Sequence, residues 1–548
     1  MNTESFLANV ENSLKTHGNL PALTDFKEKT VTYEDVAYRI AKLHVMFEIY
    51  GLKKGDKIAL TGKNSVNWAV SFLSVVTCGA VAVPILHEFT AENIHNIVNH
   101  SDATILLVDK HLLEQLDISQ MPELGLVLLV DDFSIVKSKK TDVSKQKIDS
   151  VMKEKYPENF SVENINFHKD TPEELMMISY TSGTTGYSKG VMLPYRSLLS
   201  NMRFGEEVLP NLKTGDSVVS MLPMAHMYGL AFEFLYEFIK GCHIHFLSRL
   251  PTPQIILDAF STVKPRLVVT VPLIVEKIFK KRLAPAINRP VMKIALRLPL
   301  LNQFILKKIN KKLVALFGDR FIEVIIGGAS FNADAEKFFK RIKFRYTVGY
   351  GMTECGPIIA YEDWSKTPLY SCGKAAPRME IKINSPDPEN IPGEIMTRGD
   401  NVMLGYYKNQ EATNLVLTQD GWLNTGDLGI INSDGYLFIK GRSKNMILGA
   451  NGQNIYPEEI ESKLNNTDLI SESLIIEING KIVALAYPDS DAVASGNFSQ
   501  TEITAKMEEI RVEINRHLPA YSQISQIKIQ MEEFEKTPKK SIKRYLYG

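Results

Sequence analysis

The chain has 548 residues, several times the size of a typical single domain, so at least two domains are expected. Lys and Arg total 63, Asp and Glu also total 63, and the formal net charge is therefore zero. This balance removes the bulk electrostatic case for a nucleic-acid partner, and we expect none. A hydrophobic share of 44% and a charged share of 23% are typical of an ordered globular enzyme.

The sequence also predicts a cellular location. The first 20 residues contain two Glu and lack the basic and apolar segments of a secretory signal. Apolar runs such as 81–86 are far shorter than the roughly 20 residues that cross a bilayer. The four cysteines are scattered, without CxxC spacing or a pairing pattern (Cys78, Cys242, Cys355 and Cys372). We therefore expect a reducing, cytoplasmic location.

The pattern of apolar residues predicts α/β layers. From Thr32 onward apolar residues recur at steps of four and three, which predicts an amphipathic helix that ends at Gly51. Short apolar strands separated by helix-length segments follow, which favours buried, largely parallel sheets. The predicted strands are Lys57–Leu60, Ala80–Ile85, Thr104–Val108, Leu126–Val130, Arg266–Thr270, Phe321–Ile326 and Arg345–Val348.

The predicted pattern of secondary structure changes twice towards the end of the sequence. From about Pro377 short strands alternate with Gly-bearing turns, which predicts a β-rich subdomain. After Arg442 helix and strand patterns alternate again over about a hundred residues, enough for a small domain. We expect a large N-terminal domain of α/β layers over 1–441, with the β-rich subdomain at about 377–441, and a small, mobile α+β domain over 442–548.

One stretch is strongly basic, although the chain as a whole carries no net charge. Between Glu276 and Asp319 there is no acidic residue, whereas basic and apolar residues are interleaved from Lys277 to Lys312. Such strips bind anionic lipid surfaces, at about 1 kcal/mol per basic residue near the membrane. A solvated helix face and a subunit contact are the alternatives. Peripheral membrane contact through Lys277 to Lys312 is therefore a hypothesis, and the sequence does not indicate an oligomeric state.

Residues 180–190, YTSGTTGYSKG, are rich in Gly, Ser and Thr and contain one Lys. Such a backbone can turn its N–H groups inward and, with hydroxyls and an ammonium group, form a cradle for a polyphosphate. It is not a Walker A motif, because only two residues separate Gly183 from Gly186. The segment VMLPYRSLLSNM that follows can form a helix. A flexible surface loop is the alternative interpretation of 180–190.

Two further motifs carry groups suited to a nucleotide. In 349–357, GYGMTECGP, Tyr350 could stack on a base, Thr353 could touch a phosphate and Glu354 could hold Mg²⁺. The motif lacks the third glycine of a Rossmann fingerprint, so dinucleotide binding is disfavoured. The alternative is a turn with one solvated Glu. In WLNTGD and GRSKN, Asp427 and Arg442 could grip a ribose and its neighbouring phosphate.

In their order and spacing, these motifs together with NGQNIYPEEIE resemble the adenylate-forming superfamily of acyl-CoA synthetases, adenylation domains and luciferases. The resemblance runs from about Thr32 to the C-terminus, and the motifs are highly specific in combination. Within the superfamily, LPMAHMYGLAFEF, VTVPLIVEKIFKK, VIIGGASFNADAEKFF and the basic strip look most like the long-chain fatty acyl-CoA synthetase branch.

The resemblance implies an ATP- and Mg²⁺-dependent enzyme that activates a medium- to long-chain fatty acid to acyl-AMP and transfers it to coenzyme A. Transfer to acyl carrier protein is one alternative. An acyl-adenylate-binding protein with impaired adenylation is another.

The resemblance also implies roles for individual residues. Gly328, Ala329 and Tyr350 would bracket adenine, and Gly351 and Met352 would continue that nucleotide-binding turn. Thr181 and Glu354 would support Mg²⁺, and Thr353 would serve in catalysis. Asp427 would bind the ribose, assisted by Arg442. His226 would lie at the junction with the acyl tunnel, although a packed core histidine is the alternative, and the C-terminal domain would rotate about Lys444. The phosphate loop would contain Thr181, Ser182, Gly183, Thr184, Thr185, Gly186 and Lys189.

The chain departs from the family where a C-terminal catalytic Lys is usual. The segment reads KTPKKSIKR, and alignment places Ser541 at the Lys position. We predict that Lys540 replaces that Lys, with Lys539 as the next candidate; otherwise adenylation is impaired. Two milder departures are Asn445, where an acidic residue is common, and Tyr195, where His is usual.

Overall fold

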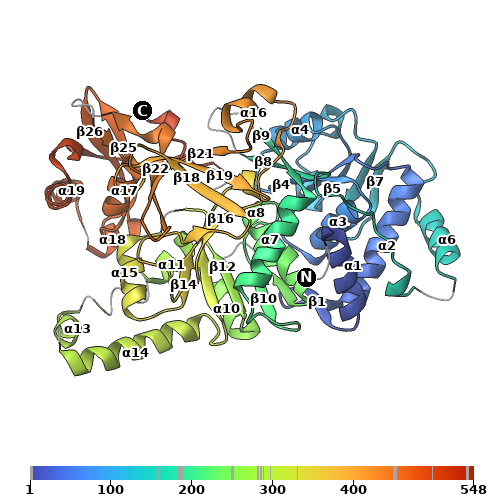
Figure 1. The fold of residues 1–548 in the computed structure, drawn as a ribbon, viewed down its shortest axis with the longest axis horizontal. Coiled ribbons are helices and arrows are strands. Elements are labelled where there is room, and N and C mark those ends of the chain that lie inside the picture. The colour runs from blue at the N-terminus through green and yellow to red at the C-terminus, as the bar shows by residue number, and fades with distance from the viewer. Residues whose placement is uncertain are drawn as a thin grey trace.

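The computed structural model describes residues 4–157, 160–181, 189–248, 252–279, 283, 287, 289–296, 298–329, 331–448, 453–496, 498–537 and 542–548. The architecture is mixed α/β, with a large N-terminal part and a small C-terminal part at one end of the molecule (Figure 1). The largest core cluster spans Phe6 to Leu437, and a separate one spans Ile455 to Ile524. This architecture confirms the predicted fold class. Among the described helices, none is long and apolar enough to cross a membrane.

An eight-stranded sheet has the order β20-β9-β8-β4-β3-β5-β6-β7. Its central strands β8, β4, β3, β5 and β6 are parallel, whereas β9, β20 and β7 run antiparallel to their neighbours. The four strands predicted before residue 131 all lie in this sheet. The strands are β3 Lys57–Thr61, β4 Val81–Ile85, β5 Ala103–Val108, β6 Leu126–Leu129, β7 Ile135–Ser138, β8 Leu175–Thr181, β9 Lys189–Pro194 and β20 Gly405–Tyr406.

The helices of this region include the predicted amphipathic one, α2. The hydroxyl of Thr32 accepts a hydrogen bond from the Asp35 amide, and the Asp35 carboxylate accepts one from the Thr32 amide. Gly51 ends the helix in the left-handed conformation, at φ +81°. The predicted helix is therefore confirmed. The helices are α1 Phe6–His17, α2 Tyr33–Tyr50, α3 Val66–Thr77, α4 Ala91–His100, α5 Lys110–Leu113 and α6 Lys145–Lys155.

Two further sheets follow the predicted α/β alternation. The sheet β10-β11-β1-β2 is parallel except for β2, and the sheet β12-β13-β14 is entirely parallel. The strands are β1 Pro21–Asp25, β2 Thr30–Thr32, β10 Ser217–Ser220, β11 His243–Phe246, β12 Leu267–Thr270, β13 Glu323–Ile326 and β14 Tyr346–Val348. The helices are α7 Tyr195–Val208, α8 Met227–Leu230, α9 Tyr236–Lys240, α10 Pro253–Val263, α11 Pro272–Ile278, α13 Pro290–Ala295, α14 Pro299–Leu316 and α15 Ala333–Arg341.

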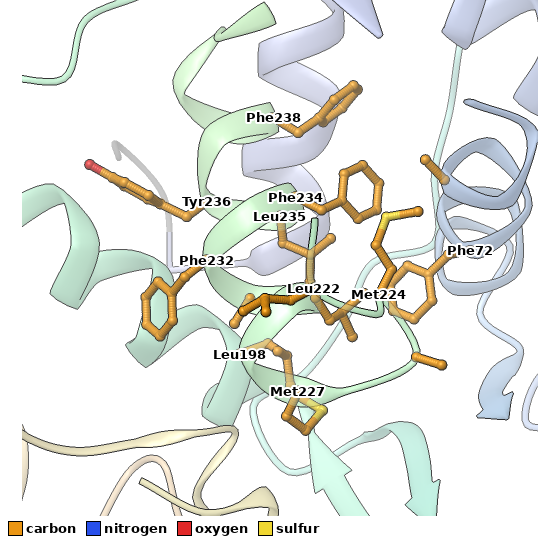
Figure 2. Packing of buried hydrophobic residues seen from close by; sticks show 14 of the residues in the cluster. Phe72, Leu198, Leu222, Met224, Met227, Phe232, Phe234, Leu235, Tyr236 and Phe238 are labelled. Atoms are coloured by element: carbon orange, nitrogen blue, oxygen red, sulfur yellow. The ribbon is translucent and has the colours of Figure 1, made fainter. Parts of the chain in front are cut away.

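A π-helical turn, Ala231–Leu235, joins α8 to α9 and packs into the core between α3 and α7 (Figure 2). The Phe234 ring lies 6.5 Å from the Phe72 ring of α3, in an edge-on contact. Burying one such ring stabilises the fold by about 1.5–3 kcal/mol. This packing fixes α8, whose first turn directly follows His226.

Antiparallel sheets dominate the predicted β-rich stretch, and a small α/β unit follows it. The strands of that stretch are β18 Met379–Asn384, β19 Gly393–Gly399, β21 Leu423–Ile431 and β22 Leu437–Arg442, with α16 Gln410–Val416. The small antiparallel sheet β15 Tyr350–Gly351, β16 Ile358–Tyr361 and β17 Lys374–Ala375 precedes it. The C-terminal elements are β23 Ile447–Leu448, β24 Asn454–Ile455, α17 Pro457–Asn465, β25 Ile470–Ile478, β26 Lys481–Pro488, α18 Ser490–Gly496, α19 Gln500–Asn515 and β27 Gln526–Ile529.

The helix predicted for VMLPYRSLLSNM is wrong for its first four residues. Residues 189–194 form β9, and α7 begins only at Tyr195. Val191 and Leu193 are buried and pair with Ser179 and Met177 of β8, so strand pairing determines the local structure. β8 and β9 therefore pair as the two strands of a hairpin.

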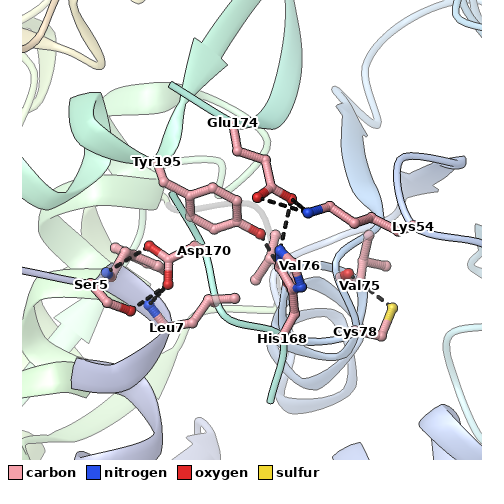
Figure 3. A network of polar contacts seen from close by, with 11 residues as sticks. Ser5, Leu7, Lys54, Val75, Val76, Cys78, His168, Asp170, Glu174 and Tyr195 are labelled. Atoms are coloured by element: carbon pink, nitrogen blue, oxygen red, sulfur yellow. Dashed lines mark hydrogen bonds and ion pairs between the residues drawn. The ribbon is translucent and has the colours of Figure 1, made fainter. Parts of the chain in front are cut away.

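Tyr195, where the family usually has His, is buried at the start of α7. Its hydroxyl donates a 3.0 Å hydrogen bond to the carbonyl oxygen of Val76 in α3 (Figure 3). The same network includes Glu174, which accepts hydrogen bonds from His168 and Lys54. Tyr195 thus fastens α7 to α3.

A buried carboxyl group makes stability pH-dependent. Glu237 of α9 is 1% exposed, and its Oε2 has no hydrogen-bond partner among the described residues. Burial raises the pKa of Glu237 to about 8. Because the folded state holds this proton while an unfolded Glu releases it near pH 4.3, stability falls as the pH rises from there towards 8.

Replacing Glu237 with Gln removes this titration. We expect E237Q to gain free energy of unfolding relative to the parent as the pH rises, with a limiting slope of about 1.4 kcal/mol per pH unit. Denaturant unfolding at pH 5 and pH 8 measures the difference. E154Q, on the exposed face of α6, is the control. An equal stability difference at both pH values would contradict the protonation assignment.

Candidate nucleotide and acyl site

The predicted phosphate loop begins and ends on paired strands. Thr181, the last residue of β8, is the cross-strand partner of Lys189, the first residue of β9. Both are partly exposed. The intervening predicted residues Ser182, Gly183, Thr184, Thr185 and Gly186 lie outside the described residues. The hairpin thus holds the first hydroxyl and the only ammonium group of the loop side by side.

The carboxyl edge of the parallel sheet β12-β13-β14 forms a second part of the site. Gly328 and Ala329 follow β13 directly and are exposed, and Gly328 has φ +86°. The amide of Gly349 donates to the carbonyl of Ile326, which holds the next strand end at the same edge. Ligands of α/β proteins commonly bind at this edge, because the loops there leave backbone groups accessible.

The turn after β14 carries the aromatic and acidic residues of the second motif. Tyr350 is buried, Gly351 is exposed and Met352 is half-buried. A Cβ on Gly351 would lie 2.2 Å from the carbonyl oxygen of Pro357, so only glycine fits there. Thr353 and Glu354 follow in a short 3₁₀ turn and are both buried. The alternative of a solvated Glu at this turn is therefore wrong.

Tyr350, Asp427 and Arg442 form one connected cluster. The Tyr350 hydroxyl donates a 2.7 Å hydrogen bond to Asp427 Oδ2, and Arg442 Nε lies 3.2 Å from Asp427 Oδ1. Asp427 and Arg442 are cross-strand partners in β21 and β22. Burial raises the pKa of Asp427, and the Arg442 guanidinium opposes that shift. Tyr350 and Asp427 are 77 positions apart in the sequence. Together with Arg442 they present a phenol, a carboxylate and an exposed guanidinium in one place.

Tyr406, which the motif analysis did not single out, connects two predicted site residues. Its hydroxyl donates a 2.9 Å hydrogen bond to Glu354 Oε1, and the Lys189 ammonium lies 4.7 Å from its ring centroid. Backbone pairing of β20 with β9 positions this tyrosine, and the Met403 amide donates to the Glu354 carbonyl. The sequence signal that could have revealed it is the strand-like GYY at 405–407.

The Y406F substitution should weaken metal-dependent ATP binding about tenfold. It removes the donor to Glu354 but keeps the ring beneath Lys189, and a hydrogen bond to a charged group is worth about 1.5–3 kcal/mol. Calorimetric ATP titrations over a range of Mg²⁺ concentrations measure the effect. The matched control is Y407F, whose lost hydroxyl donates to Asp102 instead. Equal behaviour of the two variants would refute the positioning role.

Tyr228 lies beside this edge of the sheet, two residues after His226. His226 is half-buried and immediately precedes α8. The Tyr228 hydroxyl donates to the carbonyl of Ile325, and a Cβ on Gly327 would lie 3.0 Å from Tyr228 Cζ. The motif analysis did not single out Tyr228, because its role depends on the distant strand β13. The half-buried position of His226 fits a residue at the margin of a binding site.

The donor set at the nucleotide site suits Mg²⁺ bound to phosphates. Thr181 and Glu354 offer a hydroxyl and a buried carboxylate, both oxygen donors that Mg²⁺ prefers. In the described part of the chain no three His, Cys, Asp or Glu residues form a metal-binding group. A site with one or two protein oxygens is typical of Mg²⁺ that keeps water and substrate phosphate oxygens.

The C-terminal Lys segment is anchored on both sides. Lys536 forms an ion pair of 2.7 Å with Glu472, Lys543 one of 3.2 Å with Glu535, and Arg544 pairs with Glu461. Lys536 also pairs with Ile542 in an isolated β-bridge. The predicted catalytic Lys540, with Lys539 and Ser541, lies outside the described residues. These ion pairs engage the other basic residues of the segment, which leaves Lys539 and Lys540 as the candidates.

Comparison with known proteins places the chain in a family. The family described as AMP-binding enzyme matches residues 10–407, and the AMP-binding enzyme C-terminal domain matches residues 444–547. The chain therefore belongs to the AMP-binding enzyme family. It is an enzyme of the adenylate-forming acyl-CoA ligase superfamily, which uses ATP, and the predicted superfamily is confirmed.

Individual relatives differ in substrate. Long-chain-fatty-acid--CoA ligase FadD15 of Mycobacterium bovis is 26% identical, covering 81% of this chain and 75% of that protein. Long-chain-fatty-acid--[acyl-carrier-protein] ligase AEE15 of Arabidopsis thaliana is also 26% identical, covering 84% and 72%. The structure of o-succinylbenzoate CoA synthetase from Bacillus subtilis, in complex with ATP and magnesium, is 19% identical, with TM-score 0.75 over 99% and 98% of the chains. The last similarity concerns the fold.

Proposed function

We propose that this enzyme converts a medium- to long-chain fatty acid, ATP and coenzyme A into acyl-CoA, AMP and pyrophosphate. The Tyr350–Asp427–Arg442 cluster beside the exposed Gly328 and Ala329 is the observation that carries the nucleotide part of the proposal. The relatives that act on long-chain fatty acids support the acyl part.

The adenylation step needs groups that bring the fatty acid carboxylate and the ATP phosphates together, although both are anionic. Tyr350 and the 328–329 backbone would hold adenine, and Asp427 would accept hydrogen bonds from the ribose hydroxyls. Lys189 would contact the phosphates, and the Thr353 hydroxyl would lie at the reacting phosphate. Mg²⁺, when bound by Thr181 and Glu354, would offset negative charge on the phosphates. The fatty acid carboxylate then attacks the α-phosphorus, and pyrophosphate leaves.

The acyl-AMP is a mixed anhydride, which the coenzyme A thiol attacks with release of AMP. We place the domain boundary at 441/442, where β22 ends, and assign Lys444 as the pivot of the C-terminal domain. Rotation there would exchange the adenylation groups for a thiol channel. His226 would lie between the phosphates and the acyl pocket, with Tyr228 at its wall. We propose a cytoplasmic location for this chemistry.

Pyrophosphate release from ATP, Mg²⁺ and coenzyme A, measured against a panel of carboxylic acids, tests the function. We expect kcat/KM to rise with aliphatic chain length, because each buried methylene contributes about 0.8 kcal/mol. A preference for aromatic acids would contradict the acyl assignment, and absence of turnover with every acid would contradict the activity.

Acyl carrier protein is the second candidate acceptor, because a relative of equal identity is a long-chain ligase for that protein. Supplying either coenzyme A or acyl carrier protein to enzyme that already holds acyl-AMP distinguishes the two acceptors. Faster acyl transfer to the carrier protein would reassign the acceptor without changing the adenylation step. The third reading, binding of acyl-adenylates with impaired adenylation, predicts no pyrophosphate release at all.

A further inference from the structure

Helix α14 extends along the lower edge of the large domain, and α13 lies near its end (Figure 1). One side of α14 is anchored to the body. Leu313 is fully buried, and Phe317, just after the helix, is 1% exposed. The Asn310 side chain donates to the carbonyls of Ile342 and Lys343. The helix is therefore held in place by its C-terminal half, and the opposite face is open to solvent.

Three large apolar side chains lie exposed at the N-terminal end of this open face. Phe304 is 68% exposed, Leu301 49% and Leu298 48%. Leu301 and Phe304 are three residues apart and share one side of the helix. A soluble surface usually scatters such side chains singly, so three within seven residues indicate a contact surface. We call Leu298, Leu301 and Phe304 the apolar tip.

Lysines continue the same face towards the C-terminal half of the helix. Lys308 lies one turn beyond Phe304, and Lys311 and Lys312 lie one turn beyond Lys308; with Lys307 these side chains are all exposed. The stretch 277–318 holds 11 of the 63 basic residues of the chain and none of the 63 acidic ones. Since the whole chain is neutral, the positive charge is a local feature of this surface.

We propose that α14 docks the enzyme on membranes that expose anionic phospholipids. The apolar tip enters the boundary between headgroups and acyl chains, and the four lysines contact the negatively charged headgroups. An acidic protein partner would satisfy the lysines, but it gives no reason for a phenylalanine exposed by two-thirds at the protruding end of the helix. A lipid surface accommodates both the apolar tip and the lysines of α14.

Co-sedimentation of the full chain with vesicles tests the docking. We expect binding to phosphatidylcholine vesicles that contain phosphatidylserine, little binding to phosphatidylcholine alone, and release by salt. The double substitution K308Q/K311Q should weaken binding about thirtyfold, at two lost headgroup contacts. The double substitution L301S/F304S should weaken it about tenfold or more, because its apolar tip is lost.

The control is K145Q/K147Q/K153Q on α6, which also exposes lysines but has no large exposed hydrophobic side chain among the described residues. It should bind vesicles like the parent. Equal loss in this control, or salt-insensitive binding to neutral vesicles, would overturn the proposal. Retention of an acidic carrier protein by the lysine face without vesicle binding would overturn it too.

Insertion of the tip has its own readout. F304W should show a fluorescence blue shift and quenching by brominated lipids when anionic vesicles are added, and its unchanged emission with vesicles would contradict insertion. Neither measurement requires ATP or a fatty acid. A failure of docking is therefore distinguishable from a failure of the proposed ligase activity, which pyrophosphate release reports without vesicles.

Discussion

Replacing Asp427 with Asn should reduce kcat/KM for ATP by about a hundredfold. Asp427 is 9% exposed, accepts one hydrogen bond from Tyr350 and pairs with Arg442, and we assign its remaining acceptor sites to the ribose hydroxyls. Hydrogen bonds to a charged acceptor are worth about 1.5–3 kcal/mol each, and the ribose offers two hydroxyls. Because the ribose is bound in the same way throughout the reaction, most of the loss should be in KM.

The Asn substitution preserves side-chain shape and an acceptor for Tyr350, so the β21–β22 pairing should survive. ATP–pyrophosphate exchange at varied ATP concentration measures the effect, and thermal unfolding verifies the fold. D420N, at an exposed turn of the same subdomain, is the matched control and should behave like the parent. An unchanged KM for ATP in D427N would remove the ribose assignment.

Strands and helices in which apolar residues recur regularly could be predicted from the sequence. Each of the seven predicted strands matches the structure at one end and is shifted by one or two residues at the other, because each is a short apolar run between turn residues. The helix prediction for 191–194 is wrong because this run of apolar residues fits either a strand or a helix. Only pairing with β8 on one side and β20 on the other decides it.

Site residues carried by motifs could be predicted, whereas residues that act through distant pairing could not. The sequence assigns Tyr350 to the base and Asp427 with Arg442 to the ribose, and the structure joins the two assignments by a hydrogen bond and an ion pair. The contacts of Tyr406 and Tyr228 involve strands far away in sequence. The strand-like GYY at 405–407 indicates a strand at Tyr406 but not its partner Glu354, and no local pattern distinguishes Tyr228 from a packed tyrosine. The contact of Asn445 is likewise visible only in the structure, where its side-chain amide donates a 2.6 Å hydrogen bond to Glu458.

Replacing Lys540 with Ala should lower the rate of adenylation by roughly a hundred- to a thousandfold, the usual cost of losing one preorganised electrostatic group. The effect should be confined to the first half-reaction. Pyrophosphate release in single turnover measures adenylation, and acyl transfer from added acyl-AMP to coenzyme A measures the second step. The second step should keep the parent rate, since the proposed rotation removes this segment from the reacting atoms.

Lys539→Ala is the matched control, because it removes the same charge one residue earlier in KTPKKSIKR. It should retain adenylation, whereas S541K should restore activity to the Lys540→Ala background if position 541 is where the family's Lys acts. Lys536 and Arg544 are poor substitutes, because their charges are already paired with Glu472 and Glu461. Full adenylation by Lys540→Ala together with loss in Lys539→Ala would transfer the role to Lys539. Full adenylation by the double variant would show that this chain activates its acid without a lysine from the C-terminal segment.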